Sequence, residues 1–345
     1  MKSSYISTLA WTSSAMSSVS RLQTEISKTT KEIASGRHAD VGLTLGLKTG
    51  QSVSLYATQA SITAQTQSNT FAASVLSTTQ TARSHILENA NSFLADLVTG
   101  SSSFADDSTL VSQADSTLST LISALNTSDG ERYVFGGTNS GVVPMAEYDN
   151  GPATAVNDAF YAAFGMYPDD ANVSSISASD LTTFLDGDFA ALFGDPGWSN
   201  TWSSASDTVL TSKISNSSRV DIASTANEEG MRNLTMAATM VAKLGTANLS
   251  AAAREVLLSK ATTAAGAAVT QITQESANLG ISQNRITQAN KVLTESKTLV
   301  ATRLTSLEGV DTAEAKTRLD TMTTQLQMSY STTAKLMQLS LLNYV

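Results

Sequence analysis

Two histidines are the side chains of this sequence with the clearest potential for acid–base or metal chemistry. His38 lies in GRHAD, where a His-x-Asp spacing could supply half of a metal site, but no further His, Cys or carboxylate cluster is spaced to complete it. His85 lies beside the apolar stripe of a helical pattern, and no Gly-x-Ser-x-Gly motif places a nucleophile for it. We therefore expect a solvated loop residue at 38, a packing or surface residue at 85, and no catalytic or metal-binding residue.

Two glycine-rich segments invite comparison with nucleotide-binding loops. In GLTLGLKTG, residues 42–50, three residues separate the first two glycines, and a leucine separates the second glycine from the lysine. A phosphate loop needs four residues and then Gly-Lys-Ser/Thr, so that successive backbone amides face the phosphates. FGGTNSG lacks the dinucleotide-binding spacing, so we expect a tight turn at Gly136 and Gly137. The sequence predicts neither enzyme activity nor a cofactor.

The composition excludes further kinds of site and partner. Cysteine is absent from the 345 residues, which excludes disulfides, thiolate catalysis and cysteine-based metal sites. A net charge of −9 argues against nucleic acid and anionic membranes, because both require clustered Lys and Arg. No apolar run approaches the ~20 residues of a membrane span, and the first residues lack the pattern of a cleaved secretion signal. We expect no nucleic acid and no membrane as a partner.

Proline and the large aromatic residues mark out a central segment. All four prolines lie between residues 144 and 196, and residues 144–202 also hold two of the three tryptophans and most of the phenylalanines. The flanking segments are free of proline, which removes the commonest interruption of long helices. The sequence therefore predicts helical arms around a central insert of different character.

The N-terminal arm has helical periodicity in three stretches. The first helix is expected to end at Gly36 as a C-cap, with a loop to about Leu45. A longer helix is expected from about Leu47 to Val98, and a third after an N-cap at Asp106 or Asp107. The stripe residues are Val19, Leu22, Ile26, Thr29 and Ile33 in the first helix; Ile62, Asn69, Leu76, Arg83, Ala90 and Leu97 in the second; and Leu110, Ala114, Leu118, Leu121 and Leu125 in the third.

The C-terminal arm regains helical periodicity at about Asn227. A long run from Ser250 to Leu307 contains a heptad seam, EGVD interrupts it at 308–311, and a last helix begins with a capping box of Asp311 and Glu314. Two stripes on that last helix indicate two packing partners. The seam is Leu279, Ser282, Ile286, Ala289, Leu293, Ser296, Val300 and Leu307; the stripes are Ala315, Leu319, Met322, Leu326, Ser329, Thr333 and Leu336, and Tyr330, Ala334, Met337 and Leu341.

Between the arms, the patterns are those of turns and strands. RYVFGGTNSGVVP is typical of a hairpin, and TVLTSKISNSSRVDIA alternates like a strand. We expect a mainly α protein with a β-rich insert, in which long antiparallel helices and coiled coil extend from both termini. The expected domains are a terminal coiled coil of 1–45 with 308–345, a helical rod of 46–130 with 223–307, and a mixed, mainly β insert of 131–222 with one or two short helices.

Both ends of the chain carry apolar side chains on more than one face. The last ten residues, LMQLSLLNYV, contain no charge. If the first and last helices pair, they form a slender element with little core, so neighbouring subunits must cover the rest, as in a repeating assembly with heterologous contacts. The expected assembly surface is Ile6, Leu9, Met16, Val19, Leu22, Ile26, Ile33, Leu319, Met322, Leu326, Tyr330, Leu336, Met337, Leu339, Leu341, Leu342, Tyr344 and Val345.

These features resemble the flagellin family, the axial proteins of the bacterial flagellum. KEIASGR is similar to that family's helix-loop-helix start, ERYVFGGTNSGVVP to its Tyr-x-Phe-x-Gly-Thr segment before the insert, and EGVDTAEAKTRL to its Val-Asp-x-Ala-Glu-Ala turn. Together with the ending LSLLNYV, they are more similar to the hook-associated junction proteins of the family than to flagellin, whose final tripeptide differs. One departure is SGRHADVGLTLG, which lacks the family's usual Asp-Asp stretch, so the orientation of the second helix on the first stays open.

The resemblance implies a structural role at the hook-filament junction. Such a protein is exported unfolded through the flagellar secretion channel without a cleaved signal peptide, and its terminal helices form an inner tube while the insert projects outward. The implied partners are copies of itself in a ring or helical assembly, the preceding hook-associated junction protein, flagellin and an export chaperone. Two alternatives remain: flagellin itself, as the filament subunit, or a secreted helical adhesin or translocator.

Overall fold

The computed structural model describes residues 8–102 and 107–342, and it describes the surroundings of side chains at 13–100 and 108–335. The chain divides into two compact units. The first unit contains residues 1–64 and 292–345, and the second contains residues 65–291.

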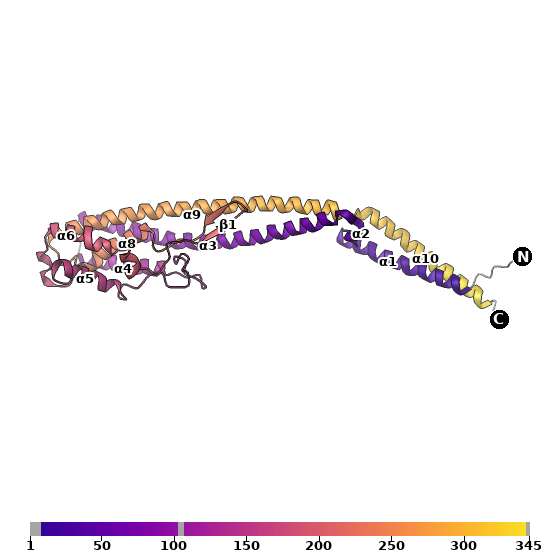
Figure 1. The fold of residues 1–345 in the computed structure, drawn as a ribbon, viewed down its shortest axis with the longest axis horizontal. Helices are drawn as coiled ribbons and strands as arrows, with labels where there is room; N and C mark the ends of the chain where they lie inside the picture. Colours follow the sequence, from indigo (N-terminus) through magenta and orange to yellow (C-terminus); the bar gives the residue numbers. More distant parts are fainter. Residues whose placement is uncertain (1–7, 103–106, 343–345) are drawn as a thin grey trace. The chain divides into compact units, whose positions relative to one another are not determined.

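The first unit is built from helices of both arms (Figure 1). α1 (Thr8–Ser35) packs along α10 (Thr312–Leu342), and the start of α3 (Thr49–Ser102) packs along the end of α9 (Ala251–Glu308). The short helices α2 (Val41–Leu45) and η1 (Gly46–Lys48) connect α1 to α3. Among the described residues of this unit the buried apolar cluster is small; it consists of Ile62, Val300 and Leu304, with Leu55 and Leu293 packed against it.

The breaks between the helices of the first unit lie where they were predicted, but the expected loop to about Leu45 was wrong in part, because α2 occupies its second half with Asp40 as N-cap. α1 ends at Gly36, which has a φ of +67° and donates its N–H to the Glu32 carbonyl at 2.8 Å. At the start of α10, the Asp311 carboxylate accepts hydrogen bonds from the backbone N–H groups of Ala313 (2.8 Å) and Glu314 (3.2 Å), which confirms the N-cap. The Glu314 carboxylate, however, binds Arg318 at 3.1 Å, so the reciprocal half of the expected capping box is replaced by an ion pair.

The second unit surrounds the remaining length of α3 and α9 with α4 (Asp107–Leu125) and α8 (Glu229–Lys243) (Figure 1). The predicted stripe positions of α3 and α4 in this unit are buried. The polar member Asn69 donates hydrogen bonds to the Ile214 carbonyl (3.2 Å) and to the Asn290 side chain (2.9 Å). Of the two predicted N-caps of α4, Asp106 lies outside the described residues, and so does the side chain of Asp107.

A small hairpin forms where the sequence alternates like a strand. β1 (Thr211–Lys213) pairs antiparallel with β2 (Arg219–Asp221), with Ser212 opposite Val220. The apolar side chains of the hairpin pack between the two long helices of the second unit, because period-2 alternation places them on one face. This cluster comprises Ile214, Val220, Ile222, Ala72, Leu76, Leu279 and Ile286.

The insert contains more helix than the sequence indicates. The overall class, mainly α with a central antiparallel pair of strands, agrees with expectation. Within 131–222, however, the residues outside β1 and β2 form helices and turns. The helices are α5 (Pro152–Phe164), η2 (Ala171–Ser175), α6 (Ala178–Phe184), the π-helical turn η3 (Leu185–Phe189) and α7 (Gly197–Thr201).

Aromatic residues account for this difference, because here they form a helical core rather than strand faces. Phe160 and Phe164 lie one turn apart on α5 with their rings 4.8 Å apart, and contacts between rings continue through α6 and η3 to α7. Trp198 and Trp202 stack with their ring centroids 5.9 Å apart, and both are fully buried. Trp198 also donates its indole N–H to Asn227 at 2.8 Å.

The expected hairpin at RYVFGGTNSGVVP was wrong, although the expected turn is present. Tyr133 donates its N–H to the Ser140 carbonyl at 2.8 Å, but the described residues of this segment pair only through isolated bridges. Gly137 has a φ of +60°, and a Cβ there would lie 2.5 Å from the carbonyl oxygen of Ser206. Gly137 therefore lets the segment pass close to the loop that contains Ser206, whereas a Cβ at Gly136 would meet Asn139 and Ser140 of the turn itself.

Candidate assembly surface

The terminal helices α1 and α10 lie side by side in the first unit (Figure 1). Gln23 of α1 donates a 2.8 Å hydrogen bond to the Tyr330 hydroxyl of α10. Of the side chains described on the two helices, only Thr29 and Ala315 are buried. The helix pair therefore has almost no interior of its own.

The predicted assembly residues that the structure describes lie along this pair. Seven of them are half-buried at the contact: Val19, Leu22, Ile26, Ile33, Leu319, Met322 and Leu326. Met16 and Tyr330 are instead 58% and 50% exposed. Six further predicted residues lie in α1 or α10 at positions where the surroundings of side chains are not described: Leu9, Leu336, Met337, Leu339, Leu341 and Leu342. The other three lie outside the described residues: Ile6, Tyr344 and Val345.

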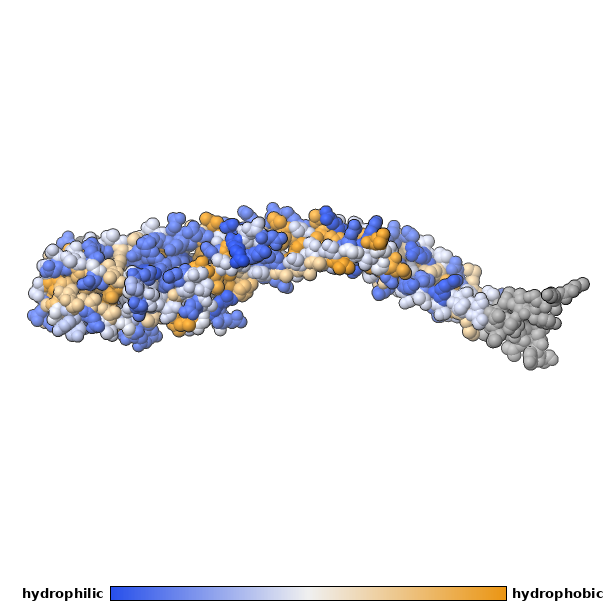
Figure 2. Space-filling view, in the orientation of Figure 1, coloured by the Kyte–Doolittle hydropathy of each residue, from blue (hydrophilic) through white to orange (hydrophobic). Residues whose placement is uncertain are grey.

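Further apolar side chains of the first unit face solvent. Leu43 of α2 is 80% exposed and Leu47 of η1 is fully exposed. The space-filling view shows apolar residues scattered among hydrophilic ones (Figure 2); on the first unit they include Val53, Val292, Leu299 and Met328. Isolated exposed leucines are ordinary, but here several exposed apolar side chains lie on an element with a small core, which makes this surface the candidate assembly surface.

The two loops that join the helix pairs are bound to each other. The His38 N–H donates to the Glu308 carbonyl at 3.0 Å, and the Val310 N–H donates to the Gly36 carbonyl at 3.0 Å. These bonds form an isolated antiparallel bridge between Arg37 and Gly309. The ends of α1 and α9 are thus fastened by backbone contacts at the positions where both helices stop.

A buried carboxylate strengthens this junction, which we call the Glu308 clasp. Glu308 is 1% exposed and accepts hydrogen bonds from the Ser52 hydroxyl and, at 2.8 Å, from the Tyr56 hydroxyl. Arg37 forms an ion pair with it at 2.5 Å, and its guanidinium lies 5.6 Å from the Tyr56 ring centroid. The clasp therefore joins side chains from the loop after α1, from α3 and from the end of α9.

The charge of Glu308 is stabilised despite its burial. Burial alone would raise the pKa of this carboxyl group, but the hydrogen bonds from Ser52 and Tyr56 and the positive charge of Arg37 outweigh that effect and lower the pKa. Burial and the hydrogen bond to Glu308 raise the pKa of Tyr56. The clasp is consequently a carboxylate held by neutral donors and one cation at neutral pH.

The two histidines take no part in a metal or catalytic site of the described structure. The His38 Nδ1 lies 3.8 Å from Glu32, whose carboxylate also accepts the Ala39 N–H at 3.1 Å. The His85 side chain is 70% exposed, as expected for a surface residue. Among the described residues, no group of three or more His, Asp or Glu side chains is arranged to hold a metal ion.

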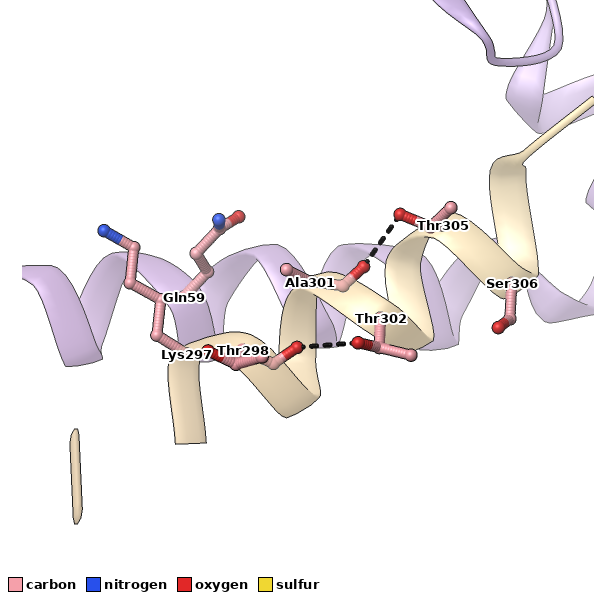
Figure 3. Close-up of a pocket in the computed structure, with 7 residues that line it drawn as sticks. All are labelled: Gln59, Lys297, Thr298, Ala301, Thr302, Thr305 and Ser306. Atoms are coloured by element: carbon pink, nitrogen blue, oxygen red, sulfur yellow. Dashed lines mark hydrogen bonds between the residues drawn. The ribbon is translucent and has the colours of Figure 1, made fainter. Parts of the chain in front are cut away.

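A shallow groove of ≈ 500 Å³ between α3 and α9 of the first unit contains polar side chains without catalytic geometry. Figure 3 shows the hydroxyls of Thr302 and Thr305 turned back to the carbonyls of Thr298 and Ala301, each at 3.0 Å. Gln59 and Lys297 lie at its other end. The residues lining this groove include no carboxylate or histidine to activate a hydroxyl as a nucleophile.

Sequence reasoning missed all four residues of the Glu308 clasp. Heptad spacing predicts Leu307 as the seam residue, but Glu308 is the residue that is buried. A signal was present: both helix breaks pair a glycine with an opposite charge, Gly36-Arg37 in one and Glu308-Gly309 in the other. If the N-terminal and C-terminal arms lie side by side, the two breaks come together, and Arg37 and Glu308 are then predicted to form an ion pair.

Two family models match the arms of the chain. The bacterial flagellin N-terminal helical region matches residues 6–140, and the bacterial flagellin C-terminal helical region matches residues 262–345. Together they cover more than half of the sequence and include both halves of the clasp. The chain belongs to the flagellin family.

This flagellin-family protein also has a fold similar to that of a solved relative. A structure described as that of a candidate flagellar hook-associated protein from Vibrio parahaemolyticus matches with a TM-score of 0.53 at 11% identity, covering 76% of this chain and 97% of that one. At such low identity the likeness concerns the fold alone. No curated protein matches the chain in sequence.

Family membership decides between classes of function. The chain is a structural, non-enzymatic component of the bacterial flagellum, exposed outside the cell, and not an adhesin or translocator of another family. Its assembly partners are accordingly flagellar proteins. Among the helices that the structure describes, none has the length and apolar character of a membrane span.

Proposed function

We propose that this flagellin-family protein is hook-associated protein 3, the hook-filament junction protein, which assembles on the end of the hook and adapts it to the flagellin filament. The observation that carries the assembly role is the nearly coreless pair of α1 and α10, in which only Thr29 and Ala315 are buried among the described side chains. Helices need tertiary packing for most of their stability, so this pair requires neighbours.

The assembly surface is the set of apolar residues on the terminal helices. Because apolar residues lie on more than one face of the pair, more than one neighbouring subunit contacts it, and a repeated heterologous contact of this kind generates a ring or a helix. In that assembly residues 1–45 with 308–345 form the inner tube, residues 46–130 with 223–307 form the helical rod around it, and the insert of 131–222 forms the outer surface.

Two observations favour the junction over the filament. The segments ERYVFGGTNSGVVP and LSLLNYV are more similar to those of junction proteins than to those of flagellin. The fold similarity is to a protein described as hook-associated. On this basis the neighbours are copies of the chain, the preceding hook-associated junction protein and flagellin.

Export precedes assembly in this proposal. The chain passes through the flagellar secretion channel unfolded, without a cleaved signal peptide, and a chaperone holds it soluble until then. Two features support this route. Cysteine is absent, so no crosslink obstructs threading, and the long helices contain many Ser, Thr and Ala residues, which pack less strongly than leucine.

Deletion of the gene tests the junction role. The expected strain makes hooks, and its filament subunits are lost to the medium because they have no surface on which to add. Electron microscopy of the cells and gel analysis of the medium measure both outcomes. Filaments of normal length on the deletion strain would contradict the proposal.

Flagellin itself is the second candidate, because the family models fit either member. Copy number separates the two. A junction protein is scarce in sheared filaments relative to the main subunit, whereas a protein that makes up most of the sheared mass is flagellin.

A further inference from the structure

One peptide bond of the insert joins two residues that can react with each other, Asn150 and Gly151. It is the only Asn-Gly pair in the sequence. The backbone nitrogen that follows an asparagine can attack the side-chain amide, and glycine shields this nitrogen least because it has no Cβ. The sequence therefore places one candidate for spontaneous covalent modification here.

The structure leaves this pair open to the reaction. Asn150 and Gly151 are both exposed, in the turn that precedes α5. The Gly151 N–H has no hydrogen-bond acceptor among the residues that the structure describes, so no such bond has to break before the nitrogen reacts. The Asn150 Nδ2 donates to the Glu147 carboxylate at 3.5 Å, which is the outer limit of a hydrogen bond and holds the side chain weakly.

The fold requires glycine at the second position of the pair. Gly151 has a φ of +123° and a ψ of −58°, a backbone conformation that residues with a Cβ rarely adopt. It is also the N-cap of α5, and its carbonyl accepts the N–H groups of Thr154 (3.1 Å) and Ala155 (3.2 Å). The residue that makes Asn150 reactive is thus fixed by the turn.

Asn150 lies between two anchors of the first turn of α5. Before it, the Tyr148 carbonyl accepts the Ala153 N–H at 2.8 Å, and the Tyr148 ring centroid lies 6.1 Å from that of the buried Trp202. After it, the Gly151 carbonyl binds the amides of the same turn. An additional main-chain atom at residue 150 would change the spacing of these two anchors and weaken the bonds at the start of α5.

We propose that Asn150 is a site of spontaneous deamidation, and that the isoaspartate formed there loosens the start of α5 as the protein ages. The Gly151 nitrogen, after losing its proton to hydroxide, forms a bond to the Asn150 Cγ, and the Cγ–Nδ2 bond breaks with release of ammonia. Water then opens the resulting cyclic imide. Opening at the Cγ–N bond gives aspartate, and opening between the backbone carbonyl carbon and the nitrogen gives isoaspartate, whose main chain runs through Cβ and Cγ. The net reaction consumes one water for each ammonia released.

A location outside the cell makes this change cumulative. The chain belongs to a family of flagellar components that are exposed outside the cell. Enzymatic repair of isoaspartate uses S-adenosylmethionine, an intracellular cofactor, so an exported copy keeps the modification. The inference uses this location and does not depend on the proposed junction role.

The experiment incubates the purified full-length chain in neutral buffer at physiological temperature and follows its peptides by mass spectrometry. Conversion of the amide to a carboxylate adds about 1 Da, and labelling with an isoaspartyl methyltransferase distinguishes isoaspartate from aspartate. Asn216 in the exposed turn between β1 and β2 is the internal reference, because the residue that follows it, Ser217, has a Cβ. We expect Asn150 to be modified about tenfold faster than Asn216.

Matched variants separate the site and its consequence. Asn150→Gln keeps an amide but would have to form a larger ring, so we expect it to abolish the modification at this position, whereas Asn216→Gln should leave it at the native rate. Asn150→Asp carries the charge of the product without the longer main chain. Hydrogen exchange of the amides at 153–155 should be about tenfold faster in the isoaspartate fraction than in fresh protein, and it should be native in Asn150→Asp.

Three outcomes would overturn the inference. If Asn150 is modified no faster than Asn216, it is not the proposed site. An isoaspartate fraction with native hydrogen exchange at 153–155 would contradict the loosening of α5. Exchange that is equally fast in Asn150→Asp would assign the loosening to charge and not to the lengthened main chain.

Discussion

The hydroxyl of Tyr56 on α3 lies 2.8 Å from the Oε2 of Glu308, the last residue of α9, and donates a hydrogen bond to it. The two residues are 252 positions apart in the sequence. The same carboxylate holds Arg37 of the loop that follows α1. One buried acid thus connects three segments of the first unit where the terminal helix pair begins.

Replacement of Tyr56 by phenylalanine removes one donor from this acid and keeps the ring. A hydrogen bond to a charged group contributes about 1.5–3 kcal/mol, and since Tyr56 is 38% exposed we expect a loss at the lower limit, about 1.5 kcal/mol of unfolding free energy. Urea denaturation followed by circular dichroism measures it. Tyr330→Phe is the matched control, because the Tyr330–Gln23 bond is exposed, and its effect should stay within about 0.5 kcal/mol. Equal losses in both variants would contradict a special role for the clasp.

Acid is expected to open the Glu308 clasp. The folded pKa of Glu308 is lowered below its ordinary value, so its contribution to stability is complete above the unfolded pKa, about 4.3, and is lost as the pH falls through the folded pKa. Glu308→Gln should therefore show a smaller loss of stability than the native protein between pH 5 and about 2.5. Denaturation curves across this range give the measurement. Parallel pH profiles of the two proteins would count against the prediction.

The long helices could be predicted from the sequence because their signal is local and repeated. Asn69, Leu76, Arg83, Ala90 and Leu97 recur every seven residues in the second unit, and all are buried on α3. Helical periodicity depends only on neighbours three and four residues away, so a single amino-acid sequence is sufficient to detect it.

The insert and the clasp could not be predicted in the same way. The spacing of Phe160 and Phe164 is helical, but aromatic residues near Gly and Pro also favour strands, and only the shared core with α6 and α7 decides between them. Glu308 is charged, so its burial depends on donors more than 250 residues away in the sequence. Hydrogen bonds from residues so distant in the sequence allow a charged group to be buried, but they cannot be detected from the local spacing of apolar residues.

A second buried charge, Arg83 of α3, is expected to stabilise the second unit. Its guanidinium is fully buried, binds the Glu228 carboxylate, and lies 2.6 Å from the Glu275 carboxylate. Removal of one partner from a buried pair costs about 3–5 kcal/mol, and since both acids are partly exposed we expect about 3 kcal/mol for Arg83→Met.

The compensating variant makes this prediction specific. Arg83→Met combined with Glu228→Gln and Glu275→Gln removes the uncompensated acids, so it should recover part of the lost stability. Chemical denaturation of the single and triple variants provides the comparison. If the triple variant is less stable than the single variant by the full cost of two more substitutions, packing and not charge is the function of Arg83.

Glu275 gives the second unit a pH response opposite to that of the clasp. Burial, followed by the hydrogen bond and charge of Glu228, raises its pKa to about 7 in spite of Arg83. A raised folded pKa contributes stability that is present below the unfolded pKa, about 4.3, and is lost as the pH rises to about 7. The native second unit should therefore lose stability between pH 5 and 8, and Glu275→Gln should reduce that loss. Thermal melts at these pH values test it, and a variant with the native slope would contradict it.

Removal of residues 336–345 separates folding from assembly. The second unit is formed by residues 65–291 alone, so its cooperative melting should be unchanged by the truncation. Incorporation into the flagellum should be abolished, because the apolar segment LMQLSLLNYV belongs to the proposed assembly surface and its loss leaves neighbouring subunits without a partner. Circular dichroism melts and the recovery of filaments in a deletion strain measure the two effects.

Gln325→Ala, at an exposed polar position of α10, is the control and should be incorporated normally. Loss of cooperative melting in the truncated monomer would instead assign these ten residues to the core of the single chain.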